Sequence, residues 1–462
     1  MTDKKKAIGF DCWDTLLVRP FINPADLFGF LGKGFKERRI DAERQARREK
    51  KEPNLYDIYE NLPDADARAE IEAEKRFSRP RADVLEIFNR AKKDGMAVVI
   101  VSDFYMPAAD LAEILEKNGV VGYDKLFVSC DYGKSKRGGL FDEVAKEYEL
   151  VGFYGDNKKA DIEPLQGRVF DLHHLKRYAD LFLAAYPRLK QLDFANWRVS
   201  YWAGLCAIDW NENKARGYWE RLGFMLGVFN YAFCQWIKEK VEQRGIKRLL
   251  FVARDGWTLE KIYNRIDPAT PTAYIYANRL LLKRQAAEPD KGEYKGYLTA
   301  IFDNQPEPTD TAVIDTLTHR YSAFRFLKIP DALLILVMDC KRSGEFKTLS
   351  FNKAPALQLK NWDFMELLIT APTPPIVDID EAGAPIYGTN DEEEKRLPVV
   401  ADICRGVLDF QPDPAVRFIY RDVMPILNNF FDNLTEQDKA EFATIKHSPT
   451  GGHTKYRDIF KG

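Results

Sequence analysis

Acidic and hydroxyl-bearing residues stand where three short apolar segments of the chain end. Asp11 follows KAIGF, Ser102 ends AVVIVS, and Asp156 ends VGFYGD, with Asp161 a few residues further on. A carboxylate such as Asp11 can act as a nucleophile toward phosphorus. Asp156 and Asp161 can help to hold Mg²⁺, which prefers oxygen ligands. Because Ser102 can donate a hydrogen bond to a phosphoryl oxygen, the set predicts phosphoryl-transfer chemistry.

A basic loop adds a cation to this set. The segment DYGKSKRGG contains Lys134 and Lys136, and either lysine could neutralise charge on a transferred phosphoryl group. Acids at strand ends are common, so no single residue is specific for this chemistry. The order of these groups along the chain, each in its own loop, is what favours it.

The hydrophobic pattern predicts the elements that would position these residues. Apolar segments typical of buried strands alternate with segments of helical spacing such as VLEIFNRAKKDG and LFDEVAKEYEL. Such alternation predicts a parallel sheet with helices on both faces, in which functional groups gather at the carboxyl ends of the strands. Residues 24–90, rich in Glu, Arg, Lys and Ala, are predicted to form several helices. The charged run 36–52 is interpreted as a solvated helix held by i,i+4 ion pairs.

A second alternating block begins after about residue 195. Its strand-like segments include KRLLFVARDG, TAVIDTLTHR and ALLILVMDC, which predict a second α/β domain. Arg254, Asp255 and Asp315 stand at predicted strand ends and form a candidate second ligand site. The alternative is structural, with Asp255 capping a helix that begins near Trp257. If the strands bring them together, further members of this site would be Arg279, His319 and Arg320.

Composition and charge narrow the class of protein. The 462 residues are 45% hydrophobic and 30% charged, which suits two or three well-packed domains. With 69 basic and 71 acidic residues the net charge is −2, whereas a dedicated nucleic-acid binder would usually be more basic. The N-terminus shows no signal-peptide pattern, and the apolar run 222–237 is too short and too polar to predict a membrane span. The cysteines form no CxxC pair, so free thiols in a reducing cytoplasm are expected.

The ordered set resembles the motifs of the haloacid dehalogenase (HAD) superfamily, whose first motif is hydrophobic-Asp-x-Asp-x-Thr. In the segment FDCWDT, Asp11 matches the nucleophile of that motif and Thr15 matches its threonine. The remaining matches are Ser102 for the second motif, Lys136 (with Lys134 as the alternative) for the third, and Asp156 with Asp161 for the fourth.

This resemblance covers roughly residues 6–190 and implies both a fold and a cofactor. The fold would be a Rossmann-like parallel sheet, with a helical cap inserted after the first motif at about residues 20–88. The cofactor would be Mg²⁺. Its ligands would come from Asp11, the backbone carbonyl of Trp13, and Asp156 with Asp161.

One position departs from the family pattern. The second aspartate of the first motif, which in HAD phosphatases protonates the leaving group, is Trp13 here, and the next residue is Asp14. Asp14 could replace this acid if the loop turned it inward. The haloacid dehalogenases and the phosphonate hydrolases of the superfamily also lack the aspartate, so cleavage of carbon–halogen or carbon–phosphorus bonds is an alternative. Because the dehalogenases lack the Gly-Asp of the fourth motif, Gly155-Asp156 favours Mg²⁺ and phosphoryl chemistry.

The segment FDCWDT also resembles a narrower group of large bacterial HAD proteins often found with surface-polysaccharide biosynthesis enzymes. Their second domain has a strand ending in Ala-Arg-Asp-Gly, matched here by FVARDGW at 251–257. We therefore expect an α/β protein with a HAD-like domain at 1–190 and a second α/β domain at 200–462 that could bind a phosphosugar or nucleotide. The expected function is a cytoplasmic, Mg²⁺-dependent hydrolase or phosphotransferase for a small phosphorylated metabolite, associated with polysaccharide biosynthesis enzymes. The alternative is a degenerate HAD domain that serves as a binding or scaffold module for a transferase-like second domain.

Overall fold

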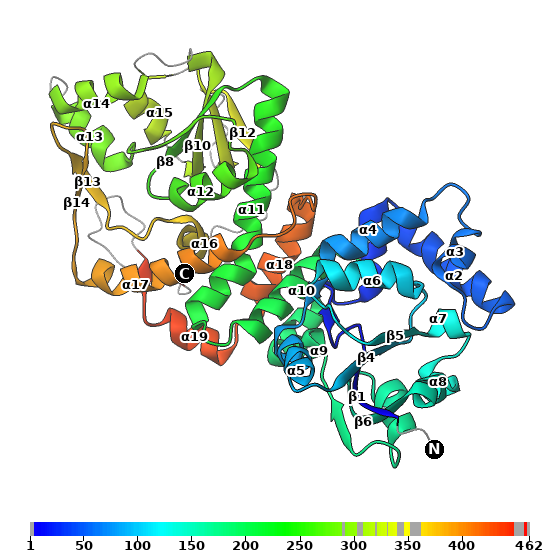
Figure 1. Cartoon of the computed structure of the whole chain (residues 1–462). Coiled ribbons are helices and arrows are strands. Elements are labelled where there is room, and N and C mark those ends of the chain that lie inside the picture. The colour runs from blue at the N-terminus through cyan, green and yellow to red at the C-terminus, as the bar shows by residue number, and fades with distance from the viewer. Residues whose placement is uncertain are drawn as a thin grey trace. The chain divides into compact units, whose positions relative to one another are not determined.

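The computed structural model describes residues 4–288, 292–302, 308–318, 321–329, 331–339, 346–351, 362–447 and 457–459. Contacts divide the chain into two compact units, Met1–Lys214 and Ala215–Gly462 (Figure 1). Residue 200, the predicted start of the second domain, lies within helix α10 (Trp197–Glu212) of the first unit. This helix packs against α9 (Tyr178–Ala185), and Ser200 Oγ accepts a hydrogen bond from the backbone nitrogen of Ile22 at 3.0 Å. These contacts tie α10 to the first unit.

The first unit is built on a five-stranded parallel sheet in the order β5-β4-β1-β6-β7. β4 is buried along its whole length, as expected for a parallel strand covered by helices on both faces. The predicted α/β class is therefore confirmed for this unit. The strands are β1 (Lys5–Phe10), β4 (Ala97–Ser102), β5 (Lys125–Val128), β6 (Tyr148–Gly155) and β7 (Asp171–His174).

Alternate side chains of the central strands enter two different hydrophobic cores. On β4, Val98 and Ile100 belong to one core, whereas Val99 and Val101 belong to the other. This is the period of two that a strand imposes. The first core is completed by α5 (Ala82–Lys93) and α6 (Ala108–Lys117), and the second by α8 (Leu140–Glu147). The shorter elements are α7 (Ser129–Tyr132), η2 (Lys136–Gly138), η3 (Lys158–Ile162), η4 (Glu163–Leu165) and η5 (Pro187–Gln191).

A helical insertion separates β1 from β4 in the chain. An antiparallel ribbon of β2 (Leu17–Val18) and β3 (Arg79–Pro80) joins its two ends. The charged run 36–52 forms most of α2, but Arg39 of this helix is fully buried and pairs with Glu70 at 2.7 Å. The predicted i,i+4 ion pairs are present, Arg39 with Glu43 at 3.1 Å and Arg47 with Glu43 at 2.8 Å. The side of the helix that carries Arg39 is buried, however, because Glu70 neutralises this arginine there. The insertion contains η1 (Pro24–Leu27), α1 (Phe28–Leu31), α2 (Phe35–Glu49), α3 (Leu55–Tyr59) and α4 (Ala67–Phe77).

The second unit has a five-stranded parallel sheet of its own, in the order β12-β11-β10-β8-β9. This sheet confirms the prediction of a second α/β domain. Its strands are β8 (Arg248–Val252), β9 (Thr272–Ile275), β10 (Thr311–Thr318), β11 (Leu333–Asp339) and β12 (Thr348–Ser350). The helices are α11 (Tyr218–Arg244), α12 (Gly256–Ile266), α13 (Arg279–Ala287), α14 (Gly292–Phe302), η6 (Pro308–Asp310), α15 (Ser322–Leu327), α16 (Trp362–Ile369), α17 (Asp391–Asp409), α18 (Tyr420–Asp432) and α19 (Glu436–Phe442).

The apolar run 222–237 lies in α11, which is buried on most sides in the second unit. A helix that is apolar all round must be enclosed by other elements, here above all by α17. The two helices cross closely, since a Cβ atom at Gly406 would lie 1.9 Å from the backbone oxygen of Glu220. Within the described part of the chain, no helix has both the length and the apolar character needed to cross a lipid bilayer.

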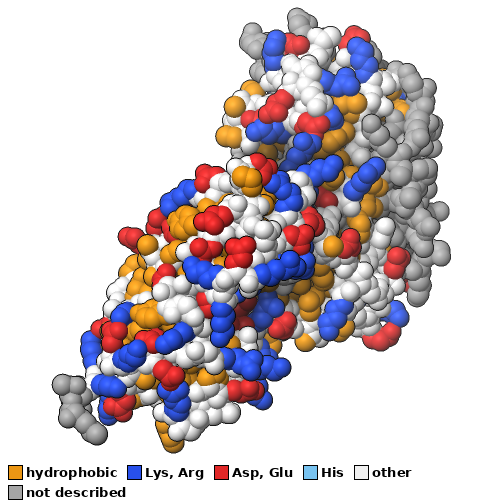
Figure 2. All heavy atoms as spheres, turned by 90° about the vertical axis from the view of Figure 1, so that its right-hand side faces the viewer, with side chains coloured by type: hydrophobic (Ala, Val, Ile, Leu, Met, Phe, Trp, Pro, Cys, Tyr) orange, Lys and Arg blue, Asp and Glu red, His pale blue; other side chains and the backbone are white. Residues whose placement is uncertain are grey.

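Small features complete the second unit. The proline-rich stretch 371–388 contains the antiparallel hairpin of β13 (Ile376–Ile379) and β14 (Pro385–Tyr387). A further short pair is β15 (Lys446–His447) with β16 (Arg457–Asp458). Basic and acidic side chains are interspersed over the face drawn in Figure 2, as expected from a net charge of −2.

Candidate active site

The order of the first sheet places a topological switch point between β1 and β6. From β1 the chain continues to β4 and β5 on one side, whereas β6 and β7 lie on the other. In open α/β sheets, ligands bind at the carboxyl ends of the strands beside such a point. Asp11 directly follows β1, and its backbone nitrogen donates to Tyr154 O of β6 at 2.8 Å. Because Asp156 directly follows β6, both carboxylates stand at this edge.

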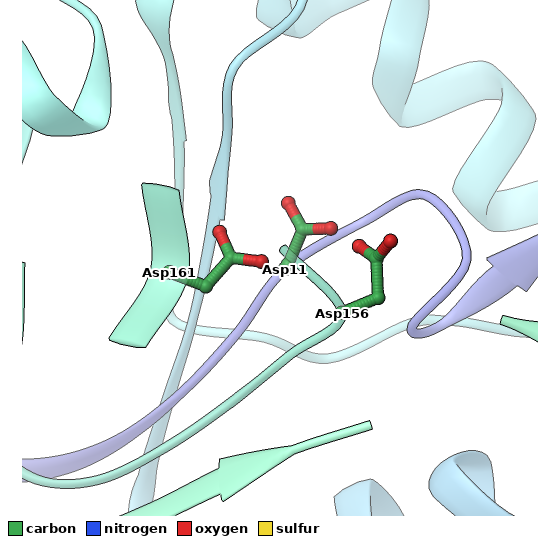
Figure 3. Close-up of side chains that lie close together, drawn as sticks. All are labelled: Asp11, Asp156 and Asp161. Carbon is green, nitrogen blue, oxygen red and sulfur yellow. The ribbon is translucent and has the colours of Figure 1, made fainter. Parts of the chain in front are cut away.

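Three carboxylates meet at the switch point. Ligand oxygens of Asp11, Asp156 and Asp161 all lie within 4.8 Å of one another (Figure 3). Asp161 belongs to η3, and its Oδ2 accepts a hydrogen bond from the backbone nitrogen of Asn157 at 2.8 Å. Gly155 leaves room for this turn because it has no side chain. A Cβ atom at its position would lie only 2.4 Å from Asp161 Cβ. The close packing of Asp161 therefore explains the glycine of the Gly-Asp pair that was predicted as the fourth motif.

Lys136 is the lysine that joins the carboxylates. Its Nζ atom lies 2.5 Å from Oδ1 of Asp11 and 2.5 Å from Oδ1 of Asp161. The loop is anchored because the backbone nitrogen of Lys136 donates to Asp103 Oδ1 at 2.7 Å. Lys134, the alternative, pairs instead with Glu143 at 2.5 Å and is partly exposed. The structure thus places Lys136, and not Lys134, among the predicted site residues.

The site holds more negative than positive charge. Burial raises the pKa of Asp11 well above its ordinary value, against the opposing effect of Lys136, and Asp161 and Asp156 raise it further. Burial and the charges of Asp14 and Asp161 raise the pKa of Asp156 to about 7. The pKa of Lys136 is raised as well, because Asp11 and Asp161 outweigh the lowering effect of burial. One buried ammonium group therefore does not compensate all the carboxylates.

These residues fit a divalent metal ion. Three carboxylates with oxygens within 4.8 Å form the hard, all-oxygen donor set that Mg²⁺ prefers. A bound dication would also supply the positive charge that would lower the pKa values of Asp11 and Asp156. Asp11 and Asp156, at the ends of adjacent strands, are the residues that would hold it, with Asp161 as the third carboxylate.

Comparison with known proteins does not assign this chain to a family. No protein-family model matches the chain, and no curated protein matches it significantly. The resemblance to the HAD superfamily therefore stays a prediction, which depends on the residues that match its motifs.

The two predicted hydroxyl residues lie at the same edge of the sheet as Asp11. Ser102 is the last residue of β4, and the pairing of Phe10 with Ile100 places it beside the end of β1. Thr15 is fully buried, and its Oγ1 lies 3.5 Å from Asp11 Oδ2. The Thr15 hydroxyl thus points toward the Asp11 carboxylate, and Ser102 stands at the neighbouring strand end.

Trp13, at the position where the HAD pattern that the sequence resembles has its second aspartate, has a buried aromatic ring. The guanidinium carbon of Arg19 lies 3.4 Å from the centroid of this ring, and the ring of Phe104 lies at 5.2 Å. Arg19 in turn donates to Glu74 of α4 at 2.7 Å. Among the described residues, the indole nitrogen of Trp13 has no hydrogen-bond partner. The Trp13 side chain thus connects the loop that follows β1 with the helical insertion. It has no acidic group.

Asp14 is engaged elsewhere, although its charge acts on Asp156. Its backbone has a φ of 55°, in the left-handed region, which is uncommon for a residue with a side chain. Arg177 Nε donates to Asp14 Oδ2 at 2.9 Å, and Arg81 donates to the Asp14 carbonyl at 3.0 Å. This ion pair occupies the carboxylate that could replace the missing acid.

Three residues of the site are absent from the sequence prediction. Asp103 orients the lysine loop, Asn157 orients Asp161, and Arg177 holds Asp14. The first two are neighbours of predicted site residues, so their proximity is a usable signal. Arg177 follows the last strand of the sheet, and no local pattern distinguishes it from other surface arginines.

The residues predicted for a second site also come together, at the carboxyl ends of β8 and β10. Thr316 Oγ1 donates to Asp255 Oδ2 at 2.5 Å, and Thr316 N donates to Asp315 Oδ1 at 2.8 Å. The predicted cap is wrong, since the Asp255 side chain makes no capping hydrogen bond to α12. Its carboxylate is held by Thr316 instead. Arg254 lies next to Asp255, Arg279 is exposed at the start of α13, and His319 and Arg320 lie outside the described residues.

Proposed function

We propose that the first unit is a Mg²⁺-dependent hydrolase or phosphotransferase that acts on a small phosphorylated metabolite. The observation that carries this proposal is the meeting of Asp11, Asp156, Asp161 and Lys136 at the switch point of the sheet. A nucleophile, an oxygen donor set and a buried cation are the groups that phosphoryl transfer through a carboxylate requires. The match of these residues to the HAD motifs supports the same reaction.

Asp11 is the nucleophile of the proposed reaction. One of its carboxylate oxygens attacks phosphorus, the bond between phosphorus and the leaving-group oxygen breaks, and an aspartyl-phosphate forms. Water then attacks this phosphorus, which releases phosphate and regenerates the carboxylate; a second acceptor in place of water gives phosphotransfer. When bound, Mg²⁺ neutralises charge on the phosphoryl oxygens.

Other side chains orient the nucleophile and the phosphoryl group. Lys136 Nζ, 2.5 Å from Asp11, fixes the carboxylate and neutralises charge that develops on the transferred group. Ser102 and Thr15 donate hydrogen bonds at the edge of the site. Asp161 holds Lys136 in place through its 2.5 Å contact.

In the proposed reaction the leaving group receives no proton from residue 13, the position that is an aspartate in HAD phosphatases. Trp13 has no acidic proton, and Asp14 is paired with Arg177 at 2.9 Å. General acid catalysis typically contributes about 10²–10⁴ in rate, so its loss matters most for poor leaving groups. The proposed substrates are therefore compounds whose leaving group departs as a stable anion, such as acyl phosphates and phosphoanhydrides.

A second candidate function follows from the same position. If Trp13 marks a site that has lost catalytic activity, the first unit is a binding or scaffold module, and the second unit is the catalytic, transferase-like domain. The resemblance of FDCWDT and FVARDGW to proteins found with surface-polysaccharide biosynthesis enzymes supports that setting for either function.

Phosphate release from a panel of compounds separates the two candidates. The panel contains sugar phosphates, nucleotides, acyl phosphates and phosphonates, each with Mg²⁺ and with EDTA. Wild type is compared with Asp11→Asn and Lys136→Ala, and Lys134→Ala is the control from the same loop. Mg²⁺-dependent release that is lost in the first two variants and kept in the control is expected. Absence of release from every compound would favour the binding module.

A further inference from the structure

The second sheet has a topological switch point of its own. The chain runs from β8 to β9 on one side, and β10, β11 and β12 then extend the sheet on the other. In such a sheet, ligands bind at the carboxyl ends of the strands beside the switch point, here those of β8 and β10. Asp255, just after β8, and Thr316, in β10, meet there through a hydrogen bond of 2.5 Å.

Two arginines whose charges act on Asp255 share one carboxylate. Arg254 Nη1 lies 3.3 Å from Glu393 Oε2, and Arg396 Nη1 lies 3.6 Å from Glu393 Oε1. Burial and the charge of Arg254 lower the pKa of Arg396. Burial raises the pKa of Asp255, and the nearby charges of both guanidinium groups oppose this rise. The arginines and Asp255 therefore belong to one cluster.

Arg396 has a donor that the described residues leave unused. The residue is only 3% exposed, and its Nε atom has no hydrogen-bond partner in the described part of the chain. A buried donor without an acceptor is unfavourable, so an acceptor oxygen brought by a ligand would be bound strongly there. Arg254, Asp255 and Asp315 remain partly exposed, which makes the cluster accessible from solvent.

We propose that Arg254, Asp255, Asp315 and Arg396 bind a hydroxylated ligand that carries an oxyanion, the chemistry of a sugar phosphate. Guanidinium groups match the planar oxygen pairs of phosphate and carboxylate. The two aspartates supply acceptors for hydroxyl groups of the same ligand. A divalent cation fits less well, because the arginines of the cluster would repel it. The proposal concerns the second unit and does not depend on the reaction proposed for Asp11.

The state of the aspartates suits this role. Burial and the charge of Asp255 raise the pKa of Asp315 to about 7, and burial raises the pKa of Asp255. Near neutral pH the Asp315 carboxyl group therefore holds a proton part of the time. It can then donate a hydrogen bond to a hydroxyl oxygen as well as accept one, and it repels a nearby phosphate less than a full charge would.

Hydrogen–deuterium exchange on the full chain tests the proposal, with glucose 1-phosphate, glucose and inorganic phosphate as probes. Glucose 1-phosphate is expected to slow exchange in peptides that cover residues 250–262 and 311–318. Each of Arg396→Gln and Asp315→Asn should weaken its binding by about tenfold or more, as expected for the loss of a charge-assisted hydrogen bond. Arg405→Gln, on the exposed side of the same helix as Arg396, is the matched control and should bind like wild type.

The result separates this site from the first one. Binding to the second unit should persist in Asp11→Asn, whether or not the first unit is an enzyme. Slowed exchange confined to the first unit, or second-unit protection unchanged by Arg396→Gln and Asp315→Asn, would overturn the proposal. Equal binding of glucose or of inorganic phosphate would overturn it too, as would no binding of any probe. If circular dichroism shows that Arg396→Gln does not fold, the binding of glucose 1-phosphate by the single variants Arg254→Gln and Asp315→Asn tests the proposal instead.

Discussion

The Nζ atom of Lys136 lies 2.5 Å from Oδ1 of Asp11, although the two residues are 125 positions apart in the chain. Asp103, at the end of β4, makes this possible by binding the backbone nitrogen of Lys136 at 2.7 Å. The lysine is 3% exposed and is surrounded by carboxylates whose charge it only partly compensates. The stability of the first unit should therefore depend on this one residue.

Removal of the Lys136 charge should destabilise the first unit. Lys136→Met leaves Asp11 and Asp161 buried without their cation, and breaking a buried ion pair typically costs about 3–5 kcal/mol. The free energy of unfolding from urea titrations in EDTA measures the effect. Lys134→Met, whose lysine is largely exposed, should change it by less than about 0.5 kcal/mol. Equal losses in the two variants would contradict the buried role of Lys136.

Stability without metal should decrease as the pH rises through the range of about 4 to 7. Asp156 has a pKa of about 7 in the folded protein, against about 3.9 in the unfolded chain. In that window the folded state binds more protons than the unfolded state, so the free energy of unfolding falls, by on the order of 1–4 kcal/mol. Urea titrations of wild type and Asp156→Asn in EDTA test this. The variant should show a flatter profile, and an unchanged slope would count against Asp156 as the source.

Mg²⁺ should stabilise the first unit through Asp11 and Asp156. An ion that binds only the folded state at about a hundred times its Kd adds about 2.7 kcal/mol. The melting temperature should rise with Mg²⁺ concentration in wild type and should not rise in Asp11→Asn or Asp156→Asn. Asp142→Asn, whose carboxylate pairs with Arg168 at the surface, is the control and should respond like wild type. A uniform response of all four proteins would place the ion elsewhere.

Turnover should depend strongly on the leaving group. If the proposed phosphoryl transfer proceeds without a general acid at Trp13, acetyl phosphate should be hydrolysed faster than glucose 6-phosphate by about 10²-fold or more, the lower end of what a general acid contributes. The measurement is kcat/KM for both compounds with Mg²⁺. Comparable values would show that another group supplies the proton, and Asp14→Asn would then test the residue next to Trp13.

The crossing of α11 and α17 should not tolerate a side chain. Gly406→Ala would place a Cβ atom 1.9 Å from the Glu220 oxygen, so the helices must separate, at a cost of about 1–3 kcal/mol or more. Gly296→Ala is the matched control, because nothing lies within 4 Å of its Cβ position in α14. That change should stabilise by up to about 1 kcal/mol through helix propensity. Thermal unfolding of both variants distinguishes the close crossing from a general effect of glycine.

The class of fold and the set of candidate residues could be predicted from the sequence. Apolar strand-like segments that alternate with helical segments predicted two parallel α/β sheets, since both periods are local properties of the chain. Parallel strands also bring their carboxyl ends to one edge, so residues that follow strands were expected to meet. Asp11, Asp156 and Asp161 do meet there, and so do Asp255 and Asp315 with Thr316.

The contacts of each loop side chain, in contrast, depend on the three-dimensional packing of the chain. Lys134 and Lys136 stand in one basic loop. Packing against the strand ends buries Lys136, whereas Lys134 reaches solvent. Asp14 pairs with Arg177, which lies 163 positions further along the chain. Arg39 is buried because Glu70 of another helix meets it. Such contacts depend on strand order and on the conformation of whole loops, which the residues near each side chain do not specify.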